Sequence, residues 1–147
     1  MGERPLVAIK PVPVPDPESE GFWAAAAEHV LAIQRCTNCG WYAYPPNVAC
    51  SNCLSPKPSF RYEPVCGRGR VTTWTVVHQA FLPGFAAEVP YTVAEVELEE
   101  QQGLRVVARL VGARPGDLAI GTMVEVAFDD VAAGIAVPHF VPAGGRA

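Results

Sequence analysis

The segment CTNCGWYAYPPNVACSNC, residues 36–53, contains four of the five cysteines of the chain. They form two C-x-x-C pairs, Cys36 with Cys39 and Cys50 with Cys53, separated by ten residues. A C-x-x-C turn directs two sulfurs to one point, and Gly40 permits the positive φ that such a turn often uses. Two such turns joined by a loop supply the four thiolates of a tetrahedral site, with sulfurs roughly 2.3 Å from the metal.

This spacing predicts a structural zinc site with the ligands Cys36, Cys39, Cys50 and Cys53. Four protein ligands leave no position for a reacting water, and a structural zinc typically contributes on the order of 10 kcal/mol to folding. Iron on the same sulfurs remains an alternative. A thioredoxin-like redox site is disfavoured, because it uses one C-x-x-C on a βαβ framework. Cys66 lies in neither pair, and we expect a partly buried small hydrophobic residue there.

Size and composition limit the class of protein. The chain has 147 residues, of which half are hydrophobic and 18% are charged, as in a globular protein of one domain or two small ones. The net charge of −4 argues against nucleic acid, which is normally bound by a basic surface. No apolar run approaches the ~20 residues of a membrane span, and the N-terminus does not have the pattern of a secretory signal. We therefore expect a cytoplasmic protein with no nucleic-acid or membrane partner.

An extended arm and a helix are predicted before the cysteines. Proline alternates with valine in the arm up to Pro15, which favours a polyproline conformation over helix. Asp16 is the predicted N-cap of a helix that begins at Pro17. Its apolar face is predicted from three residues spaced by four, Phe22, Ala26 and Val30, and a short strand is predicted over 31–35.

Strand signals dominate the chain after Gly69. Alternating or β-branched residues predict five strands, over 70–79, 91–99, 104–111, 123–131 and 137–141. The connector 100–103 ends in glycine, which indicates a hairpin. Five strands in about 70 residues predict a small closed or partly open barrel, so the fold class is mainly β. The predicted regions are an extended arm (1–15), a helix with a zinc ribbon (16–66), the barrel (67–142) and a tail (143–147).

The order of these features resembles a family in which a rubredoxin-like zinc ribbon precedes an OB-fold, known as domain of unknown function 35. The pieces that carry the resemblance are Phe22-Trp23, Leu31 to Gly40, Pro45-Pro46, Cys50 to Cys53, Gly67 to Val71, Pro83 to Phe85, Pro90-Tyr91, Ile120-Gly121 and Pro138-x-Phe140. Their order is more specific than any one of them and extends over residues ~16–142. The resemblance implies an N-terminal helix, a rubredoxin-like zinc ribbon and a five-stranded OB-fold barrel.

The resemblance also implies a function. Members of the family assemble with thiolase-like proteins, so it implies a non-catalytic, zinc-containing accessory subunit of a thiolase, acyltransferase or retro-aldolase that acts on acyl-CoA thioesters. The thiolase-like partner would carry the reactive groups. This chain would stabilise the partner and help to form the channel for coenzyme A or the acyl group. Some relatives are fused to hydratase domains of steroid side-chain degradation, and the pathway of this chain does not follow from its sequence.

The loop AFLPGFAAEVP, residues 80–90, is almost uncharged. Loops between strands are normally solvated, so large apolar residues in one indicate a contact surface. The alternative interpretation is a loop that folds back and closes one end of the barrel. Under the first interpretation, the residues that bind substrate or partner are His78, Phe81, Leu82, Phe85, Pro90 and Tyr91.

No catalytic residue is predicted. The three histidines, His29, His78 and His139, lie far apart in the sequence, and no Ser-His-Asp arrangement is recognisable. We therefore expect the chain not to be an enzyme by itself. Two other functions remain open, which are a zinc-ribbon and OB module for single-stranded nucleic acid and a stand-alone acyl-CoA binder.

Overall fold

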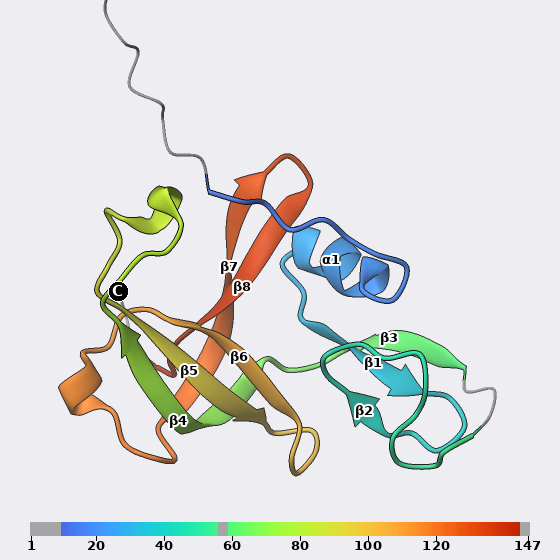
Figure 1. Ribbon diagram of the computed structural model, residues 1–147. Coiled ribbons are helices and arrows are strands. Elements are labelled where there is room, and N and C mark those ends of the chain that lie inside the picture. Colours follow the sequence, from blue (N-terminus) through green and yellow to red (C-terminus); the bar gives the residue numbers. More distant parts are fainter. Residues whose placement is uncertain (1–9, 56–58, 145–147) are drawn as a thin grey trace, which may run out of the picture.

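The computed structural model describes residues 10–55 and 59–144. A helix, α1 (Glu20–Ala27), is followed by a small sheet and then by a barrel (Figure 1). The strands are β1 (Ala32–Cys36), β2 (Tyr42–Ala43), β3 (Phe60–Pro64), β4 (Arg68–Val77), β5 (Tyr91–Leu98), β6 (Arg105–Leu110), β7 (Met123–Ala132) and β8 (Ile135–Pro142). Two short 3₁₀ turns are η1 (Pro83–Phe85) and η2 (Pro115–Asp117). The mainly β fold class is confirmed.

The small sheet has the order β2-β1-β3 and is antiparallel. The pairing of β1 with β3 runs from Ala32 opposite Pro64 to Cys36 opposite Phe60. The strand predicted over 31–35 is therefore present, displaced by one residue. Because β1 ends at Cys36, the sheet places the first cysteine at the start of its C-x-x-C turn.

The second unit is a closed barrel with the strand order β4-β5-β6-β8-β7. Its five strands and the β5–β6 hairpin agree with the strands predicted from the alternating sequence. Within the described residues, β6 meets β8 at one parallel pair, Leu110 with Phe140. Two glycines form the entry to β4: Gly67 has a φ of +75°, and Gly69 packs against the backbone of Glu97. This arrangement is the five-stranded OB barrel that the resemblance implied.

The helix begins later and ends earlier than the sequence predicts. Asp16 caps a preceding turn, in which its Oδ1 accepts a hydrogen bond from the Ser19 N–H at 2.8 Å, and α1 starts at Glu20. Phe22 and Ala26 are buried as expected. The prediction for Val30 is wrong: His29 adopts a φ of +57°, which turns the chain, and Val30 is 37% exposed.

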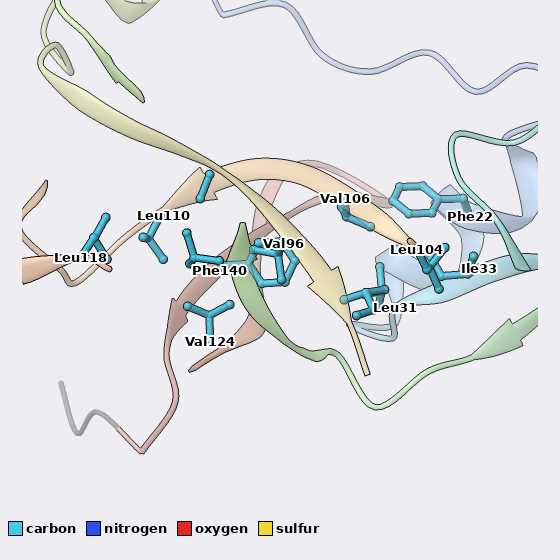
Figure 2. Close-up of a cluster of buried hydrophobic side chains, with 13 residues drawn as sticks. Phe22, Leu31, Ile33, Val96, Leu104, Val106, Leu110, Leu118, Val124 and Phe140 are labelled. Atoms are coloured by element: carbon cyan, nitrogen blue, oxygen red, sulfur yellow. The ribbon is translucent and has the colours of Figure 1, made fainter. Parts of the chain in front are cut away.

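One hydrophobic core runs through both units (Figure 2). Phe22, Leu31 and Ile33 pack in the same cluster as barrel residues such as Val106 and Phe140. The small sheet has few residues with which to build a core of its own. It shares the core of the barrel, so the two units depend on each other.

The arm enters the described part of the chain at Lys10, and residues 10–15 form no helix or strand. In Figure 1 this segment runs toward α1 past the β7–β8 hairpin. The rest of the predicted arm, and residues 145–147 of the predicted tail, lie outside the described residues. Among the described residues, no helix is both long and apolar enough to cross a membrane. A cytoplasmic location stays a prediction.

Candidate metal centre and an adjoining cleft

The four cysteines of the two C-x-x-C pairs come together. Their sulfur atoms all lie within 4.8 Å of one another. The Cys36 and Cys53 sulfurs are 3.9 Å apart, and those of Cys39 and Cys50 are 3.6 Å apart. Four sulfurs placed 2.3 Å from a central zinc would be separated by about 3.8 Å. The sulfurs are thus positioned to bind a metal ion, and their number and chemistry fit zinc.

Two asparagines link the two turns through the sulfurs. Asn38, in the first turn, donates to Cys53 Sγ, and Asn52, in the second, donates to Cys39 Sγ, each at 3.6 Å. The hydrogen bond from Asn52 lowers the pKa of the Cys39 thiol to about 6. The thiolate is the form that binds a metal. The asparagines therefore favour the metal-binding form and fix the relative orientation of the turns.

Each turn closes with a residue of positive φ, Gly40 at +77° and Leu54 at +53°. The Gly40 N–H donates to the Cys36 carbonyl at 2.8 Å, and the Leu54 N–H donates to the Cys50 carbonyl at 3.1 Å. The sequence indicates the first of these positions through its glycine. It gives no indication of the second position, Leu54, because leucine rarely adopts a positive φ.

Arg35 braces the first turn from β1. Its Nε donates to the Gly40 carbonyl at 2.8 Å, and its Nη1 lies 2.6 Å from Glu63 Oε2 on β3. The guanidinium also lies over the Tyr42 ring, 4.7 Å from its centre. The hydrogen bond from Arg35 lowers the pKa of the Glu63 carboxyl below its ordinary value. Sheet and metal centre are thereby joined through one side chain.

A cleft of about 890 Å³ lies between the outer surface of the barrel, α1 and the arm. Side chains from several segments line it, among them Lys10 of the arm, Trp23 of α1, Phe85 of the loop, Arg109 of β6 and His139 of β8. Residues 107–109 of β6 and 137–139 of β8 line it and directly precede the Leu110–Phe140 pair in the two strands.

The carboxylate of Glu88 connects two residues that line this cleft. Glu88, in the 80–90 loop, forms ion pairs with Lys10 of the arm and Arg109 of β6. Lys10 lies 5.4 Å from the centre of the Phe85 ring, and Arg109 lies 4.5 Å from the centre of the Tyr91 ring. Arm, loop and barrel therefore meet at Glu88.

Two histidines lie close to aspartates that line the cleft. His29 Nε2 is 2.8 Å from Asp130 Oδ1, and its ring stacks on Phe128. His139 Nδ1 is buried and has no hydrogen-bond partner in the described structure, although Asp129 Oδ2 is 3.3 Å away. The two aspartates are consecutive in β7, and both line the cleft.

The loop residues predicted to bind substrate or partner fall into separate groups. Phe85 and Tyr91 line the cleft. Phe81 and Leu82 point to solvent, with exposed fractions of 86% and 51%, so these two do not plug the barrel. The other two, His78 and Pro90, are exposed at the ends of the loop. Whether any of the six binds substrate or partner stays a prediction.

Sequence reasoning missed most of the cleft. Trp23, Arg109 and His139 are far apart in the chain and carry no shared motif, so only the folded structure brings them together. The alternation of residues in β6 places Arg109 on the outer face of the strand, and this was the one feature of the sequence that could have indicated a cleft residue. Cys66 also differs from expectation: it is exposed, beside the turn at Gly67.

These features define a zinc-ribbon protein with an OB-type barrel. Family models agree: the rubredoxin-like zinc ribbon domain of ChsH2 matches residues 23–59, and the C-terminal OB-fold domain of ChsH2 matches residues 62–129. A solved structure described as the Ltp2-ChsH2(DUF35) aldolase is 33% identical, with a TM-score of 0.77, over 89% of this chain and 98% of that one. The chain belongs to the ChsH2-like, or DUF35, family.

Curated relatives include two hydratase subunits and a scaffold protein. A probable enoyl-CoA hydratase alpha subunit of Thermomonospora curvata is 35% identical over 96% of this chain and 42% of its own length. The 3-oxo-4,17-pregnadiene-20-carboxyl-CoA hydratase alpha subunit of Mycobacterium tuberculosis is 37% identical over 74% and 33%, respectively. A DUF35 domain-containing scaffold protein of Methanocaldococcus jannaschii is 38% identical over 64% of each chain. The matches thus span less than two thirds of each relative.

A DUF35 protein of unknown function from Sulfolobus solfataricus shares the fold at 15% identity. Its TM-score is 0.55, over 86% of this chain and 85% of that one. At this identity the likeness supports the architecture alone.

Proposed function

We propose that this chain is a non-catalytic accessory subunit of a thiolase-like enzyme that acts on acyl-CoA thioesters. The observation that carries the proposal is the match to the Ltp2-ChsH2(DUF35) aldolase over nearly the whole of that chain. Relatives described as hydratase alpha subunits and as a scaffold protein also support a role within an assembly. The metal centre would stabilise the fold, and the partner would supply the reacting groups.

The partner would dock on the tip of the 80–90 loop. Phe81 and Leu82 expose large apolar side chains, and such residues are typical anchors at protein interfaces. The ion pairs of Glu88 hold the base of the loop against the barrel and the arm, so the tip is presented from a fixed support. His78 and Pro90, at the two ends of the loop, would contribute to the rim of the same surface. The acyl channel would then form beside Phe85 and Tyr91.

The test is co-expression of this chain with the thiolase-like proteins of its own organism. We expect one of them to copurify with this chain, and we expect thioester turnover from the pair or the partner but not from this chain alone. Replacing both Phe81 and Leu82 by alanine should leave the melting temperature unchanged and weaken assembly at least about tenfold. The control is Ile120→Ala, because Ile120 is 79% exposed on another loop.

Three results would contradict the proposal. They are sustained turnover of a thioester by this chain alone, wild-type assembly of the Phe81 and Leu82 double variant, and salt-dependent binding of single-stranded oligonucleotides. The last result would instead support the nucleic-acid function considered from the sequence.

A further inference from the structure

We infer that the cleft binds a neutral, largely hydrocarbon small molecule that carries one hydrogen-bonding group near His139. The inference rests on the proposed function in one respect: the acyl part of a thioester is a ligand of this kind. The lining residues of the cleft come from this chain, so the inference can be tested without a partner.

The size and lining of the cleft suit a small apolar ligand. Its volume of about 890 Å³ falls within the roughly 300–1,000 Å³ of small-molecule sites. Trp23, Phe85 and Tyr91 contribute aromatic rings from three different segments. Val107 lies on the outer face of β6 and is 57% exposed, although an outward strand position normally carries a polar residue. A bound hydrocarbon would cover this valine.

The charges around the cleft favour a neutral ligand. The only cationic side chains among the described lining residues, apart from any protonated histidine, are Lys10 and Arg109, and both are already paired with Glu88. Asp129 and Asp130 face the cleft from β7. A free carboxylate or a phosphate would meet these aspartates without an unpaired cation to offset them. A thioester could therefore place its acyl part here, while the phosphates of coenzyme A would remain outside.

His139 supplies the polar contact. Its side chain is 12% exposed, and its Nδ1 atom is buried without a hydrogen-bond partner in the described structure. Because Nδ1 is buried and lies 3.3 Å from Asp129 Oδ2, a ligand would meet the imidazole through the exposed part of its ring. A carbonyl or hydroxyl oxygen has the required chemistry. The imidazole of His139 would thus offer one polar contact to an otherwise apolar ligand.

The experiment uses the zinc-loaded full chain and four probes: methyl octanoate, octanoate, butylbenzene and coenzyme A. Binding is followed by the chemical shifts of backbone amides and of the Trp23 indole. We expect saturable binding of methyl octanoate, at least about tenfold tighter than octanoate, because the carboxylate would lose hydration without gaining a free cation. Coenzyme A should neither bind in the cleft nor compete.

Two exposed valines provide a matched pair of variants. Val107→Asp places a charge in the cleft and should weaken methyl octanoate binding about tenfold or more. Val111→Asp places the same charge just beyond β6, where the exposed fraction is 43% and the residue does not line the cleft, and should leave binding unchanged. Unchanged melting temperatures for both variants show that the fold is intact.

His139→Phe tests the polar contact separately. It should weaken methyl octanoate about fivefold and leave butylbenzene, which has no polar group, unaffected. If this variant fails to fold, the valine pair still decides the inference. No saturable binding, tighter binding of octanoate than of its ester, or equal effects of the two valine variants would overturn it.

The failures of the two proposals are distinguishable. A chain that binds methyl octanoate as described but never assembles with a thiolase-like protein contradicts the proposed function and leaves the cleft assignment standing. A chain that assembles normally but binds none of the neutral probes contradicts the cleft assignment alone.

Discussion

The side-chain amide of Gln101 pairs with the backbone of Tyr42 much as a neighbouring strand would. Its Oε1 accepts the Tyr42 N–H at 2.9 Å, and its Nε2 donates to the Tyr42 carbonyl at 3.0 Å. Gln101 lies in the β5–β6 turn of the barrel, whereas Tyr42 lies in β2 of the zinc ribbon. Gln34 makes the same double contact with the backbone of Asn47 inside the ribbon. One side chain thus joins the two units at their surface, above the shared core.

Gln101→Ala should therefore destabilise the whole chain. Two partly buried hydrogen bonds are lost, and we expect a decrease of about 1–2 kcal/mol in the free energy of unfolding. Gln102→Ala is the control, because Gln102 is the exposed neighbour in the same turn. Urea denaturation at saturating zinc measures both. Equal stabilities of the two variants would show that the Tyr42 contact contributes nothing.

Cys36→Ser should abolish stoichiometric metal binding, because it removes one of the four clustered sulfurs. Cys66→Ser should retain one metal ion per chain, since Cys66 lies outside the cluster. Metal analysis of the purified proteins distinguishes them and identifies the ion, and iron in place of zinc would contradict the zinc assignment. A strong chelator should lower the melting temperature of the wild type and shift that of Cys36→Ser much less. Fully folded wild type without metal would contradict a structural role for the ion.

Gly69→Ala should be among the most damaging single-methyl changes in the barrel. The added Cβ would lie 2.4 Å from the Glu97 carbonyl oxygen and 2.6 Å from Val96 Cγ1. The backbone of β5 cannot easily move away, so we expect a loss of about 1–3 kcal/mol. Gly116→Ala has no atom within 4 Å of its new Cβ and should change stability by less than about 0.5 kcal/mol. Thermal or denaturant unfolding measures the stability of both variants. Equal stabilities would contradict the close packing of Gly69 against the backbone of Glu97.

The Arg35–Glu63 pair should make stability depend on pH in acid. Arg35 holds the folded-state pKa of Glu63 below the ordinary 4.5. The pair therefore contributes stability above that ordinary value, and the contribution is lost as pH falls through the lowered pKa. Glu63→Gln should melt lower than wild type at pH 7, and the difference should shrink below pH 4.5. Glu125→Gln, at an exposed position of β7, is the control for loss of a carboxylate. A difference that is constant with pH would contradict the assignment.

The metal centre and the barrel follow from local sequence patterns. The C-x-x-C spacing brings Cys36 near Cys39 whatever the rest of the chain does, and strand alternation marks β5 as buried on one face. The ends of α1 were harder to predict. Asp16 is a good cap, but it caps a turn rather than the helix, and the positive φ of His29 has no signal in the sequence.

The cleft depends on contacts between residues far apart in the chain. Lys10 and Glu88 are separated in the sequence by α1, the whole zinc ribbon and β4, and nothing local indicates that they pair. The role of the 80–90 loop likewise depends on which of its side chains are exposed in the folded protein, and the sequence does not indicate this. Phe81 and Phe85 have the same residue type four positions apart, yet one faces solvent and the other lines the cleft.

The single parallel pair between Leu110 and Phe140 has a consequence for the motions of the barrel. Every other pair of neighbouring strands in the barrel is joined by more residue pairs. Local unfolding should therefore begin where β6 separates from β8. Backbone amide hydrogens next to the β6–β8 contact should exchange with solvent faster than those in the β4–β5 ladder. Opening there would separate β6 from β8 while the antiparallel ladders of the barrel stay paired.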